Sequence, residues 1–187
     1  MKKLIVLIFC IFTLASFSHA EMPVKFFKEE INITLKKNSV NVRGLYFFES
    51  KSNLEIDVSM FYPFPIDSSH FYPAKIKVLD PENTFDFVKK NTGIKWTLHF
   101  EPLGVKTVLV EYKQKIKEKN ATYILTTTKL WKQKIDKATF IIEAPEEFKE
   151  LNFSIKPDSV KTKAKKQFYY ITRRYFLPKT DLKISWE

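Results

Sequence analysis

Histidines and their neighbours are the first residues in this sequence whose types could support catalysis. Asp67, Ser68, Ser69 and His70 follow one another and include the three side-chain types of a serine hydrolase triad. Triads are normally assembled from separate elements of a fold, so this run in one loop is a poor candidate. The other histidine outside the N-terminal segment, His99, alternates with apolar residues and is expected on the outward face of a strand. We therefore predict no catalytic residues and no enzyme.

Spacings that are typical of metal sites are missing from the sequence, which has no paired-histidine motif and no calcium-binding loop. No metal and no cofactor is predicted. Adjacent acids occur at Glu29–Glu30 and Glu146–Glu147. Glycosidases need two carboxyl groups that face each other across a cleft. These pairs lie in polar or turn contexts, so we interpret them as solvated.

An aromatic segment that contains three prolines is the best candidate for a binding site. Pro63 and Pro65 exclude a central strand there and predict an edge or a crossover loop. Rigid exposed aromatic rings can stack on sugars or fill the pockets of a partner protein. The same rings could instead close the open end of a core, and the sequence leaves both interpretations open. The five rings are Phe61, Tyr62, Phe64, Phe71 and Tyr72.

A basic cluster is the second candidate surface of this chain, whose formal net charge is +11. Its residues flank a predicted strand and could bind an anionic envelope polymer or an acidic protein. Lysines also protect sheet edges against pairing with other strands, and we favour that interpretation. The cluster consists of Lys161, Lys163, Lys165, Lys166, Arg173 and Arg174.

The first twenty residues have the pattern of a secretory signal peptide. Lys2 and Lys3 precede an apolar run from Leu4 to Leu14, and Ala20 ends a cleavage site. The run is about half of the ~20 residues that a membrane-spanning helix needs. We expect a cleaved signal peptide at 1–20, a single domain at 21–187 and no membrane span. The protein would be exported to a periplasm or beyond the cell, which argues against a nucleic-acid partner.

Cleavage would also remove Cys10, the single cysteine of the chain. Disulfides and thiolate chemistry would then be excluded. The core must be built by packing, for which the sequence supplies 18 Phe, 8 Tyr and 3 Trp. Trp96 and Trp186 fall at inward positions of predicted strands, whereas Trp131 is predicted to be a structural plug just past a strand.

Alternation of apolar and polar residues predicts the elements that would position these groups. Segments 94–100, 108–112 and 123–127 alternate and are separated by turn residues, which predicts an antiparallel meander. Near the N-terminus the expected inward residues are Phe27, Ile31, Ile33 and Leu35, then Val40, Val42, Gly44, Tyr46 and Phe48. Gly44 predicts a bulge or a close backbone approach. About ten short strands predict an all-β fold, an immunoglobulin-like antiparallel β-sandwich.

The order of these features resembles an uncharacterised family of exported bacterial β-sandwich proteins, classed as a domain of unknown function. The resemblance covers most of the predicted mature chain and implies an exported β-sandwich, with no activity to transfer. An insertion of one residue is needed in the last motif. The matching segments are Met60–Pro65, Trp96–Pro102, Val108–Tyr112, Tyr123–Thr127, Trp131, Ala138–Pro145 and Phe176–Ile184.

We therefore expect an exported, non-enzymatic β-sandwich that acts as an interaction module in the cell envelope. Its partner would be another envelope protein, bound through sheet edges and the segment at 61–72. The alternative is a carbohydrate-binding module that stacks the same aromatic rings on cell-wall polysaccharide.

Overall fold

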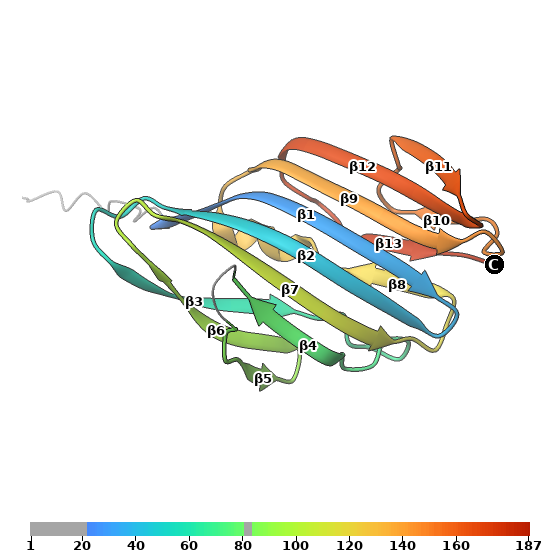
Figure 1. Cartoon of the computed structure of the whole chain (residues 1–187), viewed down its shortest axis with the longest axis horizontal. Helices are drawn as coiled ribbons and strands as arrows, with labels where there is room; N and C mark the ends of the chain where they lie inside the picture. Colours follow the sequence, from blue (N-terminus) through green and yellow to red (C-terminus); the bar gives the residue numbers. More distant parts are fainter. Residues whose placement is uncertain (1–21, 81–83) are drawn as a thin grey trace, which may run out of the picture.

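A computed structural model describes residues 22–80 and 84–187, and the predicted signal peptide lies outside these residues (Figure 1). The described chain is all-β, with thirteen strands in three sheets and one short 3₁₀ helix. Within this part of the chain, no helix is long and apolar enough to cross a membrane. The prediction of an all-β fold is confirmed, but the estimate of about ten strands was too low.

The largest sheet has seven strands in the order β11-β12-β9-β1-β2-β7-β4 (Figure 1). Neighbouring strands are antiparallel except β1 and β9, which run parallel. The sheet is therefore mixed, and an immunoglobulin-like antiparallel sandwich is not confirmed. The parallel pair is possible because the chain crosses to the other layer before it returns as β9. The strands are β1 (Val24–Lys36), β2 (Ser39–Ser50), β4 (Ala74–Leu79), β7 (Val105–Lys115), β9 (Ile135–Pro145), β11 (Ser159–Lys163) and β12 (Lys166–Phe176).

Two three-stranded sheets and the 3₁₀ helix η1 (Thr126–Trp131) cover one face of this sheet (Figure 1). Their inward side chains and those of the large sheet form one hydrophobic core, to which Phe140, Phe100 and Ile184 contribute from the three sheets. One small sheet contains β3 (Ile56–Pro63), β6 (Gly93–Phe100) and β5 (Val88–Lys90), and the other contains β10 (Asn152–Phe153), β13 (Leu182–Ser185) and β8 (Asn120–Tyr123).

The predicted meander is wrong, because its three strands lie in three different sheets. β6 pairs with β3 and β5, β7 pairs with β2 and β4, and β8 pairs with β13. Alternation shows which side chains of a strand face the core, but it does not reveal which strand lies beside it. The predicted loop after Pro63 does connect β3 to β4, and Trp96 and Trp186 are buried as predicted.

A β-bulge near the start of β1 changes which side chains face the core. The pairing of β1 with β2 shifts register between Phe26 and Lys28, so one extra residue lies on β1. Phe27 therefore packs on the outer face, with its ring centroid 6.2 Å from that of Phe47, and its predicted inward position is wrong. After the bulge the inward positions are Glu29, Ile31, Ile33 and Leu35, all of them buried.

Gly44 allows a close approach, as predicted, although the approaching group is a side chain. A Cβ atom at this position would lie 2.2 Å from the Tyr46 hydroxyl oxygen. Glycine is thus needed at position 44 so that the ring of Tyr46 can lie back over its own strand.

The substitution Gly44→Ala is expected to destabilise the protein by about 1–3 kcal/mol, the usual cost of overpacking a core. The added methyl group must displace the Tyr46 ring, which two hydrogen bonds and neighbouring rings hold in place. Chemical denaturation measures the loss. Gly104→Ala is the matched control, because its nearest contact would be at 3.0 Å and should cost less. Equal losses from both substitutions would contradict the prediction.

Candidate functional site

Just after its bulge, β1 carries a carboxyl group on its inward face. Glu29 is 2% exposed and lies in register between Tyr46 of β2 and Ala138 of β9. Its Oε1 atom is buried without a hydrogen-bond partner. Burial raises the pKa of Glu29 to about 8, so at neutral pH this group is mostly an uncharged carboxylic acid. The prediction that Glu29 is solvated is wrong.

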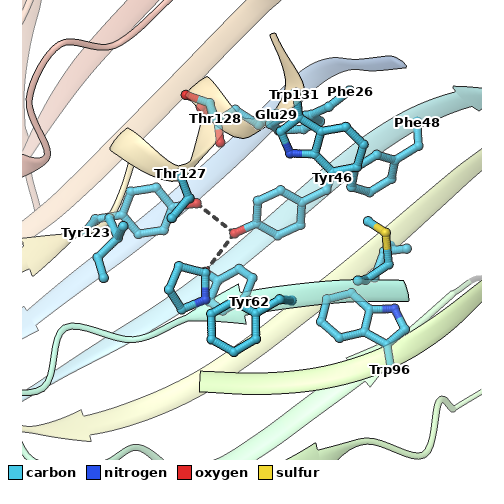
Figure 2. A pocket seen from close by; sticks show the side chains of 15 residues that line it. Phe26, Glu29, Tyr46, Phe48, Tyr62, Trp96, Tyr123, Thr127, Thr128 and Trp131 are labelled. Carbon is cyan, nitrogen blue, oxygen red and sulfur yellow. Dashed lines mark hydrogen bonds between the residues drawn. The ribbon is translucent and has the colours of Figure 1, made fainter. Parts of the chain in front are cut away.

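Three tyrosine hydroxyls meet in the pocket that Glu29 also lines (Figure 2). The Tyr46 hydroxyl is hydrogen-bonded to that of Tyr62 at 2.8 Å and to that of Tyr123 at 2.7 Å. These residues belong to β2, β3 and β8, so the hydrogen bonds connect all three sheets. Burial holds the pKa of each tyrosine well above 10, and all three hydroxyls therefore stay protonated.

Glu29 and the three tyrosines line a pocket between the layers, with a cavity volume of about 70 Å³. Most of its wall is aromatic. The Trp131 ring, from the end of η1, lies 6.0 Å from Phe26 and 5.5 Å from Phe48, centroid to centroid. Trp96 of β6 also lines the pocket, and its Nε1 atom is buried without a hydrogen-bond partner. The pocket thus combines apolar walls with a few unpaired polar atoms, a composition typical of small-molecule sites.

The five rings of the predicted aromatic site point in different directions. Tyr62 is buried in the pocket wall, and Phe64 is 2% exposed and packs against Tyr112. Tyr72 is partly buried and donates a hydrogen bond to the Gly93 carbonyl at 2.8 Å. These three rings help to close the core.

The two remaining rings of that segment are accessible. Phe61 is 50% exposed at the rim of the pocket, and Phe71 is 46% exposed with the Lys117 Nζ atom 4.9 Å from its centroid. A contact surface built on this segment would therefore consist of Phe61 and Phe71 rather than of five rings.

The predicted basic cluster lies at one edge of the large sheet. Lys161 and Lys163 lie on β11, the edge strand, Lys165 lies in the turn after it, and the others lie on β12. Lys166 forms an ion pair with Glu143 at 2.6 Å, and Arg173 forms one with Asp158 at 2.7 Å. Lysines on an edge strand fit the edge-protection interpretation.

The Asp67–His70 run forms a structured loop rather than a triad. The Asp67 Oδ1 atom accepts hydrogen bonds from the backbone N–H groups of Ser69 and His70, and it lies 2.9 Å from the His70 Nδ1 atom. The His70 ring is buried, and its Nε2 atom has no partner, so no described hydroxyl is activated by it. His99 lies on the outward face of β6, as predicted, beside Asp57. In the described part of the chain, no three His, Cys, Asp or Glu residues are grouped to hold a metal ion.

Alternation along the strands does not reveal that Glu29, Tyr46, Tyr123 and Trp131 belong to one site. A signal existed for Glu29, because its spacing of two from Ile31 continues the inward pattern of Ile31, Ile33 and Leu35. It was overlooked because an acid beside a second acid, Glu30, is normally solvated.

No protein-family model and no curated protein matches the sequence. Among solved structures, a Legionella pneumophila protein with a proposed nutrient-binding role aligns over 87% of this chain and 66% of its own, with a TM-score of 0.71 and 18% identity. An M1 zinc metallopeptidase from Deinococcus radiodurans aligns over 88% and 43%, with a TM-score of 0.53 and 8% identity. A two-domain M1 zinc metallopeptidase bound to L-arginine aligns over 87% and 42%, with a TM-score of 0.52 and 10% identity.

This chain spans less than two thirds of each of these proteins. At such low identities the likeness shows a shared fold alone. The resemblance to an exported family of unknown function stays a prediction.

Substitution of the buried acid should change how stability depends on pH. The folded protein keeps the Glu29 proton up to a pKa of about 8, whereas the unfolded chain loses it near the ordinary value of 4.5. Stability from this group is therefore full below pH 4.5, falls as the pH rises towards 8, and stays low above it. Each pKa unit is about 1.4 kcal/mol.

We expect Glu29→Gln to raise the free energy of unfolding by several kcal/mol at about pH 9 and to change it little at about pH 5. Chemical denaturation at both values measures this difference. Glu30→Gln is the matched control, because Glu30 is partly exposed and pairs with Lys28 at 2.7 Å. A pH-independent effect of Glu29→Gln would show that the carboxyl group is not held protonated.

Proposed function

We propose that this chain is a non-enzymatic binding protein that holds a small molecule in the pocket between its sheets. The observation that carries the proposal is the pair of unpartnered buried atoms in an aromatic pocket, Glu29 Oε1 and Trp96 Nε1. An unsatisfied buried polar group costs about 1–3 kcal/mol. A ligand that pairs with these atoms would remove that cost, which favours binding at this place over others.

The size of the pocket limits what part of a ligand it can hold. A water molecule needs roughly 10–15 Å³ of such a cavity. The cavity of about 70 Å³ therefore has room for a group of a few heavy atoms, and any remainder of the ligand would extend past the rim at Phe61. The proposed nutrient-binding role of the Legionella pneumophila protein is consistent with a binding function. We further propose that binding takes place after export, in a periplasm or at the cell surface.

The second candidate function is an envelope interaction module that binds another protein. Exposed Phe61 and Phe71, together with the edge strands β4 and β11, support it. Exposed sheet edges can accept a partner strand, and exposed rings can anchor it. Stacking on cell-wall polysaccharide is supported less, because Tyr62, Phe64 and Tyr72 help to close the core and leave two rings of the segment at the surface.

Equilibrium dialysis against the small-molecule fraction of the host's envelope extract tests the first candidate. We expect the protein to concentrate one compound. The Trp131→Ala variant should retain at least tenfold less of it, because Trp131 forms a wall of the pocket. Phe71→Ala, whose ring lies outside the pocket lining, should retain the compound. Equal retention by all three proteins, or none, would contradict the proposal. Affinity capture from the whole extract tests the second candidate, which would be favoured if Phe71→Ala alone lost a captured protein.

A further inference from the structure

In the part of the chain that the structure describes, the residues that line the pocket carry no positively charged side chain, which is unusual in so basic a protein. The chain contains 32 lysines and arginines, yet no lysine, arginine or histidine occurs among the described residues that line the cavity. Glu29 is the one carboxyl group in that lining. An anionic ligand would enter this site without a positive partner, and burial of an unpaired charge is costly. The lining therefore selects against anions and leaves cationic and neutral ligands.

The aromatic walls favour the cationic class. Phe26, Phe48 and Trp131 lie with their ring centroids 5.1–6.0 Å apart and form one side of the pocket, close to Tyr46 (Figure 2). Faces of tryptophan, tyrosine and phenylalanine attract cations, and aromatic cages are a recurring means of recognising quaternary and methylated ammonium groups. A carboxyl group beside such rings supplies the counter-charge that a desolvated cation needs.

We propose that the ligand is a small organic ammonium ion that also carries an oxygen acceptor, held by the Glu29 carboxylate, the aromatic walls and the Trp96 N–H group. This inference rests on the proposed function and names the chemical class of the ligand. The ammonium group would occupy the cavity of about 70 Å³, a volume that suits a head group of few heavy atoms. The oxygen acceptor would take the hydrogen bond that Trp96 Nε1 lacks.

Binding of the cation has a proton balance that can be measured. In the free protein Glu29 is a carboxylic acid near neutral pH, and its proton must leave to solvent when the cation arrives. The other titratable groups that face it are Tyr46, Tyr62 and Tyr123, which stay protonated because burial holds their pKa values well above 10. One proton is therefore released per cation bound below about pH 8, and affinity should rise about tenfold per pH unit up to that value.

Isothermal titration calorimetry of the full chain with choline as the probe tests this inference. The comparison ligand is the uncharged isostere of choline, in which a carbon atom replaces the nitrogen. We expect choline to bind and the isostere to bind at least tenfold more weakly. At about pH 7, titrations in two buffers of different protonation enthalpy should report the release of close to one proton, and at about pH 9 almost none.

Variants separate the carboxylate from the rest of the pocket. Glu29→Gln should weaken choline binding at least tenfold at about pH 9 and abolish the proton release, whereas Glu30→Gln should bind like the unmodified protein. Because Glu29→Gln is expected to be at least as stable, loss of folding would not explain such a result. Trp131→Ala should also weaken binding of the cation, through loss of an aromatic face.

The outcomes distinguish this inference from the proposed function. If the isostere bound as tightly as choline, or Glu29→Gln bound choline unchanged, the ammonium assignment would be overturned while a small-molecule pocket would stand. If choline failed to bind but the dialysis experiment still recovered a compound whose retention depended on Trp131, the ligand class would be wrong and the proposed function would remain. If neither experiment found a ligand, both would be overturned.

Discussion

The hydrogen bonds of the Tyr46 hydroxyl group are the interaction on which the arrangement of the layers depends. Tyr46 is on the large sheet, and its two partners, Tyr62 and Tyr123, lie on the two small sheets. Sheet-on-sheet packing by apolar side chains alone has little directional preference, whereas hydrogen bonds buried in a core set one register between layers. Gly44 provides the space in which the Tyr46 ring lies, and the pocket forms around the same three hydroxyls.

Much of the fold could be predicted from the sequence, because alternation reports which side chains of a strand are buried. Val40, Val42, Tyr46 and Phe48 were placed correctly, as was the crossover after Pro63. The pairing of strands could not be predicted, because alternation in β6, β7 and β8 is the same whether they share a sheet or lie in three. The parallel contact between β1 and β9 joins segments about a hundred residues apart, and nothing local specifies it.

The candidate site was largely missed for a related reason. The bulge turns Phe27 outward. Glu29 has the same spacing as the buried residues Ile31 and Ile33, but an acid beside a second acid is normally exposed, so it was interpreted as solvated. The aromatic segment at 61–72 was a better guide, since Phe61 and Tyr62 do line the pocket. The other pocket residues come from β1, β2, β3, β6, β7, β8, η1 and the link that precedes η1, and only the folded topology brings them together.

The protonation state of Glu29 is the property on which the proposed site depends most directly. A pH titration of its side-chain carboxyl carbon by nuclear magnetic resonance, assigned by comparison with Glu29→Gln, measures that state in the folded protein. We expect a midpoint near the pKa of about 8, and a lower midpoint once the pocket is filled by a cation. A midpoint near the ordinary value of 4.5, with or without ligand, would show that the carboxyl group is solvated or already paired, and would contradict the proposed site.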